Sequence, residues 1–133
     1  MPEQTIFGFD FGSKRIGIAI GQTLTKQARA LTQINNNSEP DWQTLDSLIN
    51  EWRPQTLIVG LPLNMDDSLG NSAKAAKKFA QQLQQRYQLP IELVDERLSS
   101  REARERLQQQ GKNKPNKQSI NSMAAQIILE DWL

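Results

Sequence analysis

The sequence predicts an α/β fold in which a five-stranded mixed sheet carries helices on both faces. Residues 5–34 contain three short β-forming segments in close succession, which is typical of an antiparallel meander. Residues 56–61 form a continuous apolar run between two helical patterns, and residues 91–96 form a further strand-like segment. Strand–helix–strand units of this kind place their strands in parallel through right-handed crossovers. We expect residues 1–133 to form a single domain, because a chain of this length supports one core.

The first two strands are expected within residues 5–22, on either side of the turn Gly12-Ser13-Lys14. Asp10 is a carboxylate inside a strand that is otherwise apolar. It either caps the turn by accepting hydrogen bonds from the amides of residues 12 and 13, or it is held on a rigid element to bind a cation or activate water. Small residues share one face of the second strand and leave room for another chain or a ligand: Gly17, Ala19 and Gly21.

The remaining elements follow from apolar periodicity and turn residues. A third strand is expected at 28–34, then a helix that begins near Pro40, is capped by Ser38 and ends at Pro54. The run 56–61 is typical of a buried parallel strand. A helix from about residue 72 ends at Leu89-Pro90, and the fifth strand covers 91–96. A capping-box pattern at 99–102 opens a helix that ends at Gly111, and a last helix covers 119–133.

The composition excludes several classes of site. The chain has no Cys and no His, so it has no disulfide, no thiolate zinc site and no Ser-His-Asp triad. It also has no apolar run near 18 residues and no signal-peptide pattern, so we expect a cytoplasmic protein without a membrane partner. Any catalysis must therefore depend on carboxylates, Lys, Tyr, hydroxyls or a metal ion.

Acidic residues are expected to meet at one edge of the sheet. If the first, fourth and fifth strands are parallel, their carboxyl ends lie together, and ligands bind at that edge in open α/β sheets. Asp10 and the pair Asp95-Glu96 would then approach one another. Alternation alone makes Asp95 and Glu96 face opposite ways, so either could join Asp10. A carboxylate pair without His suits a hard divalent cation such as Mg²⁺ or Mn²⁺.

A basic segment follows this edge. Residues 97–117 carry seven Lys or Arg residues against two Glu, a net charge of +5, whereas the whole chain carries +1. Such a segment is typical of a surface that contacts a polyanion. The predicted nucleic-acid contacts lie in this segment and in the first turn: Lys14, Arg15, Arg97, Arg101, Lys112, Lys114 and Lys117.

Four motifs, in this order along nearly the whole chain, resemble the YqgF/RuvX family: FDFGSKRIGIAIG at 9–21, IVGLPLNMD at 58–66, VDERLSSREAR at 94–104 and SINSMAAQIILEDWL at 119–133. Members of this family are RNase-H-like proteins related to Holliday-junction resolvases. The resemblance implies an RNase-H-like fold and a metal-dependent nuclease role in processing the 5′ end of pre-16S ribosomal RNA. Structured RNA, and with it ribosomal particles, would then be the partners.

The resemblance also implies site residues. Asp10 matches the first catalytic Asp of the family, and Glu96 matches its second acidic residue. The third position departs from the family pattern, because Asn121 stands where the family usually has Asp. An Asn oxygen can still bind a hard cation, but it attracts the cation less strongly than a carboxylate does.

Three other functions are consistent with the same residues. The fold and motifs also suit a resolvase of Holliday junctions or other branched DNA. Asn121 favours a non-catalytic RNA-binding factor in ribosome assembly, with a weakened site. The motif Asp-x-Gly-Ser-x-x-x-Gly at 10–17 resembles the phosphate loop of actin-like ATPases and sugar kinases, which need two such domains where this chain supplies one.

Overall fold

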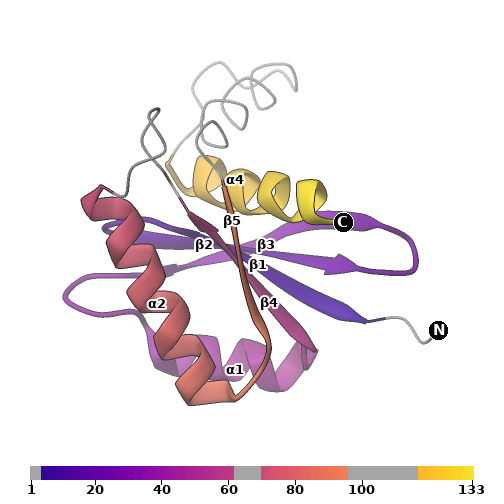
Figure 1. The fold of residues 1–133 in the computed structure, drawn as a ribbon, viewed down its shortest axis with the longest axis horizontal. Helices are drawn as coiled ribbons and strands as arrows, with labels where there is room; N and C mark the ends of the chain where they lie inside the picture. The colour runs from indigo at the N-terminus through magenta and orange to yellow at the C-terminus, as the bar shows by residue number, and fades with distance from the viewer. Residues whose placement is uncertain (1–3, 62–69, 96–116) are drawn as a thin grey trace.

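The computed structural model describes residues 4–61, 70–95 and 117–133. Its elements along the chain are β1 (Thr5–Phe11), β2 (Arg15–Gln22), β3 (Gln27–Asn35), α1 (Trp42–Trp52), β4 (Thr56–Leu61), α2 (Asn71–Tyr87), β5 (Ile91–Asp95) and α4 (Lys117–Trp132). The strands form one sheet in the order β3-β2-β1-β4-β5 (Figure 1). β2 is antiparallel to β1 and β3, and β4 is parallel to β1 and β5. The expected five-stranded mixed sheet is confirmed.

Helices cover both faces of the sheet, as expected (Figure 1). Strand alternation sends Phe7 and Phe9 of β1 into the larger core, which α1 and α2 close. Ile6 of the same strand enters a second core with Ala125 and Leu129 of α4. Because both faces of β1 are buried, this strand is apolar at almost every position, and Asp10 is its exception.

Helix α1 begins later than the sequence predicts. The proposed cap Ser38 is wrong, because the N-cap is Asp41, whose carboxylate accepts from the Thr44 N–H at 3.2 Å. The Thr44 hydroxyl donates to the same carboxylate at 2.7 Å, so Asp41 is held by two hydrogen bonds. The helix ends with Arg53 in the left-handed conformation directly before Pro54, as the proline predicts.

The small residues of β1 and β2 leave room for α4. A Cβ added to Gly8 would lie 3.1 Å from Leu129 Cβ and 3.2 Å from the Ala125 carbonyl oxygen. A Cβ added to Gly21 would lie 2.8 Å from Leu129 Cδ2. The space expected beside β2 is thus filled by a helix of the same chain, whose Ala125 and Leu129 are fully buried.

The other predicted strands and helices agree with the structure to within two residues at the ends that it describes. The expected helix at 99–111 lies outside the described residues. Within the described parts of the chain, no helix is long and apolar enough to cross a lipid bilayer.

Candidate nuclease site at the carboxyl edge of the sheet

The carboxyl ends of β1, β4 and β5 lie at one edge of the sheet, as the parallel arrangement requires. Phe9 of β1 is opposite Val59 of β4, and Leu61 at the end of β4 is opposite Asp95 at the end of β5. Asp10 directly follows Phe9. Adjacent strands are about 4.8 Å apart, so the ends of β1 and β5 are separated by roughly 10 Å. Asp10 and the residues after β5 therefore reach the same edge.

Asp10 is buried, with 6% of its surface exposed. It pairs with Gly17 of β2, and it lies on the face of β1 that carries Ile6 and Gly8 and that packs against α4. A buried carboxylate is costly unless hydrogen bonds or a cation compensate its charge. Asp10 is therefore part of strand β1, one residue before the strand ends at Phe11.

The register of β5 places Asp95, one of the two acidic candidates that the sequence leaves open. Val94 packs into the α4-side core, and the Trp132 indole N–H donates to the Glu92 carboxylate, so even-numbered residues of β5 face α4. Asp95 is an odd-numbered, exposed residue and lies on the opposite face from Asp10. Glu96 is even-numbered, like Glu92 and Val94, but it lies outside the described residues.

The turn between β1 and β2 is fixed by a contact that the sequence did not reveal. The Gly12 N–H donates to the Arg15 carbonyl at 2.9 Å, and a Cβ on Gly12 would lie 2.5 Å from that oxygen, so glycine is required. Asn36 is 6% exposed and holds this turn from the end of β3. Its side-chain amide donates to the Gly12 carbonyl at 2.7 Å, and its N–H donates to the Lys14 carbonyl at 2.8 Å.

Helix α4 is fixed against β3 by two of its side chains. The Ser122 hydroxyl donates to the Thr32 carbonyl at 3.1 Å, and Gln126 Oε1 accepts from the Ala30 N–H at 3.1 Å. These contacts flank the irregularity in the β2–β3 ladder, which occurs between Ile18 and Ala19. They set the rotation of α4 about its axis. Position 121 is one helical turn before Ala125, the residue that lies against Gly8.

The described residues contain part of the predicted site. Lys14 is exposed and Arg15 half-buried in the first turn, beside Asp10. Lys117 and Asn121 are in the first turns of α4, whose described side chains begin at Ser122. Other predicted contacts lie outside the described residues: Arg97, Arg101, Lys112 and Lys114.

A hard cation such as Mg²⁺ needs several oxygen ligands, and the described residues supply few of them. Within residues 4–61, 70–95 and 117–133, no group of three or more acidic, His or Cys side chains is arranged to hold a metal ion. The described part of the edge supplies the carboxylate of Asp10, an oxygen ligand of the kind that a hard cation binds. Further ligands would have to come from the residues after β5 and from the start of α4.

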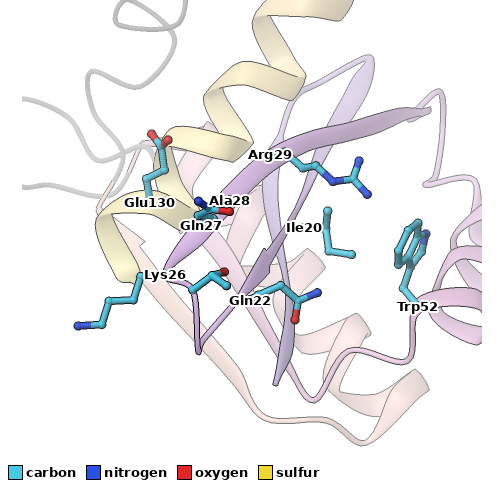
Figure 2. A pocket seen from close by; sticks show the side chains of 9 residues that line it. Ile20, Gln22, Lys26, Gln27, Ala28, Arg29, Trp52 and Glu130 are labelled. Carbon is cyan, nitrogen blue, oxygen red and sulfur yellow. The ribbon is translucent and has the colours of Figure 1, made fainter. Parts of the chain in front are cut away.

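A separate pocket lies at the opposite end of the sheet, beside the turn that joins β2 and β3 (Figure 2). It has a volume of about 460 Å³, and its lining includes Arg29, Trp52 and Glu130. The Arg29 guanidinium lies 5.5 Å from the centre of the Trp52 ring. Among the described residues that line this pocket, none is a predicted site residue, and the pocket lies at the other end of the sheet from Asp10.

Solved structures of low sequence identity share this fold. Thermus thermophilus RuvC, solved with a Holliday junction substrate, matches with a TM-score of 0.53 and 14% identity, over 94% of this chain and 91% of that chain. The yeast mitochondrial Holliday junction resolvase Ydc2 matches with a TM-score of 0.52 and 8% identity, over 96% and 76%. These matches confirm the expected RNase-H-like fold.

Curated relatives are much closer in sequence. A protein of Legionella pneumophila named "Putative pre-16S rRNA nuclease" is 49% identical over 135 residues, which span all of this chain and 97% of that protein. A protein of the same name from Nitrosococcus oceani is 49% identical over 129 residues, 96% of this chain and 85% of that protein. The model of the RuvX family, described as Holliday junction resolvase, matches residues 4–133. With this match and these relatives, the chain belongs to the RuvX family.

Proposed function

We propose that this protein is a metal-dependent nuclease that cuts a phosphodiester bond of structured RNA, with the 5′ end of pre-16S ribosomal RNA as its target. The observation that carries the proposal is Asp10, a carboxylate 6% exposed in an apolar strand, at the edge where the parallel strands end. The name shared by the curated relatives supports the choice of RNA. A nuclease with this target would work in the cytoplasm and meet ribosomal particles.

In this proposal the site is assembled from three segments of the chain. Asp10 supplies a carboxylate from β1, Glu96 a second one after β5, and Asn121 an amide oxygen from α4. We assign Glu96 rather than Asp95, because Asp95 lies on the opposite face of the sheet from Asp10. Oxygen ligands of this kind suit Mg²⁺ or Mn²⁺. When bound, such an ion would stabilise negative charge on the phosphoryl oxygens and help to generate a nucleophilic water.

The chain's own residues have defined tasks. Asp10 would orient the scissile phosphate through the shared cation, and its burial would keep bulk water from screening that charge. Lys14 and Arg15, in the turn held by Asn36, would contact neighbouring phosphates. Arg97, Arg101, Lys112, Lys114 and Lys117 would extend these contacts along the substrate.

A second candidate substrate is branched DNA, which is favoured by the description of the family model. Both substrates have the same phosphodiester backbone, so the residues proposed above would serve either. A measurement of which substrate the protein cleaves therefore distinguishes the RNA proposal from the DNA proposal.

The test is a cleavage assay with an RNA that spans the 5′ end of 16S RNA and with a four-way DNA junction, over titrations of Mg²⁺ and Mn²⁺. We expect cleavage of the RNA that requires the metal. Asp10→Asn should reduce the rate by at least about a hundredfold, the scale of a lost electrostatic or acid–base group, and should leave the fold intact. Asp131→Asn, an exposed residue near the end of α4, is the matched control.

Each outcome is informative. Junction cleavage without RNA cleavage would replace the RNA assignment with the DNA one. RNA binding without cleavage at any metal concentration would identify a non-catalytic assembly factor. If Asp10→Asn cleaves RNA as fast as the unsubstituted protein, the assignment of Asp10 to the site is wrong.

A further inference from the structure

Helix α2 carries an unbalanced positive charge on its solvent face. Lys74, Lys77 and Lys78 are all exposed, and their spacing of three and four residues places them on one side of the helix. The helix contains no Asp or Glu in its 17 residues, although an exposed helix commonly alternates both signs. The lysines therefore form a row of one sign, which we name the α2 lysine row.

Pairing within the protein does not account for this row. Arg86, at the other end of α2, forms an ion pair with Asp46 of α1 at 2.6 Å. Among the described residues, none of the three row lysines is in an ion pair. Lys74, in the first turn of the helix, opposes the helix dipole, and Lys74 and Lys78 repel each other at a spacing of four residues. The arrangement is thus not explained by the stability of α2.

The row lies near the carboxyl end of β1, on the face of the sheet opposite to the one that carries the Asp10 side chain. On its buried side, α2 packs Phe79 against Phe11, with ring centres 4.9 Å apart, and Phe11 directly follows Asp10. From Phe79 the helix runs back toward the carboxyl end of β4, where it begins (Figure 1). Lys74 is five residues before Phe79, which is about 7.5 Å along the axis. Lys77 and Lys78 are therefore at the level of Phe11, and Lys74 extends toward the edge.

We propose that the α2 lysine row binds the phosphate backbone of the RNA that flanks the cleavage site. This inference rests on the proposed function, because that function supplies the RNA. Lysines are mobile point charges that bind phosphates without reading bases. The row would therefore position the RNA along the α2 side of the sheet. Lys14, exposed at the same edge, continues that path toward Asp10.

The experiment measures RNA binding against salt concentration for Lys74→Gln/Lys77→Gln/Lys78→Gln. All binding proteins also carry Asp10→Asn, so that the RNA stays intact during the measurement. Each lost phosphate contact lowers the steepness of log K against log salt by roughly 0.7–0.9, so we expect a decrease of about 2 to 3 and at least a tenfold weaker binding near 0.1 M salt. The variant with Arg at all three positions should bind like the parent.

The matched control is Lys26→Gln/Arg29→Gln/Arg53→Gln, which removes the same charge from exposed residues at the opposite end of the sheet. It should leave the salt slope nearly unchanged. If both triple variants lower the slope equally, the effect is one of net charge, and the row is not a binding surface. If neither changes the slope, the proposal is also wrong.

Failure of this inference and failure of the proposed function give different results. If the unsubstituted protein cleaves RNA and the lysine variant binds RNA unchanged, the lysine-row proposal is wrong and the proposed function stands. If the unsubstituted protein cuts only the DNA junction and the lysine variant loses junction binding rather than RNA binding, the row serves DNA and the RNA assignment is overturned.

Discussion

Asn36 shows how a single buried polar side chain can support a site without being part of it. Its amide group and its backbone N–H hold the carbonyls of Gly12 and Lys14, which belong to the turn immediately after Asp10. Removing the Asn36 amide would leave the Gly12 carbonyl without this donor, at a position where Asn36 is only 6% exposed. The loss of a hydrogen bond to a buried group costs about 1–3 kcal/mol.

We therefore predict that Asn36→Ala lowers the free energy of unfolding by about 1–3 kcal/mol in urea denaturation. It should also lower the rate of RNA cleavage more than RNA affinity, because the turn then no longer holds β1 and β2 in one register beside Asp10. Asn37→Ala, at the exposed next residue, is the control and should change neither quantity. Equal effects of the two substitutions would show that Asn36 has no special role.

Sequence reasoning identified Asp10 and not Asn36, for a physical reason. A carboxylate inside an apolar strand is unusual, and a few neighbouring residues of the sequence are enough to reveal it. Asn36 belongs to a run of three Asn residues, where turn formation explains any Asn equally well. Its partner Gly12 is 24 residues away, and no local pattern reports such a contact.

At the scale of the elements, periodicity predicted faces better than it predicted ends. The two faces of β1 enter different cores, with Phe7 and Phe9 on one face and Ile6 on the other, as strand alternation requires. The start of α1 was wrong because Ser38 and Asp41 both suit an N-cap, and the choice depends on hydrogen bonds with Thr44. Leu129 was missed in α4 because its burial depends on glycines in distant strands.

Helices α1 and α2 are joined by a polar contact that predicts a pH dependence. Arg86 donates two hydrogen bonds to Asp46, and the Tyr87 hydroxyl donates a third at 2.6 Å. The hydrogen bonds from Arg86 and then from Tyr87 lower the pKa of Asp46 from its ordinary 3.8 to about 2. Since the folded-state pKa is below the unfolded-state value, this contribution to stability is present above about pH 4 and is lost as the pH falls toward 2.

We predict that Asp46→Asn lowers the melting temperature at pH 7 by about 1 to 5 °C, the scale of an exposed pair in a domain of this size. The difference from the unsubstituted protein should shrink between pH 4 and pH 2, where Asp46 becomes protonated in the folded state. Melting curves across this range are the measurement. Glu51→Gln on the same helix is the control, and a difference that stayed constant with pH would contradict the assignment to Asp46.

At the scale of the whole molecule, the candidate site exists only because distant segments converge. The strand order brings β1 beside β4 and β5, although more than 40 residues separate β1 from β4 along the chain. The sequence predicted this convergence from the parallel strands, and the register of β5 places Asp95 on the face of the sheet opposite to Asp10. The α2 lysine row was overlooked, because three lysines in a helix resemble a solvated surface until the packing of Phe79 locates them beside the edge.

The proposed metal ion would connect the three converging segments, so its binding should appear in the stability of the whole protein. A ligand that binds only the folded state raises the melting temperature, and the rise grows with the logarithm of the ligand concentration relative to its Kd. Asn121 contributes no charge, which leaves Asp10 and Glu96 as the proposed carboxylates facing divalent cations. In the proposed site, Asn121→Asp would add one negative charge to the ligands of the metal ion, where a charge would act more strongly than on the surface.

We predict that Asn121→Asp tightens Mg²⁺ binding by about tenfold, or ~1.4 kcal/mol, and raises the rate of cleavage. Without metal it should lower the melting temperature, because like charges then crowd one site. Titration of the melting temperature with Mg²⁺ measures both effects. Asn50→Asp, which adds the same charge to the exposed surface of α1, should show neither. If Asn121→Asp shifts neither the Mg²⁺ midpoint nor the metal-free melting temperature, position 121 does not face Asp10, and the assignment of the third ligand to α4 is wrong.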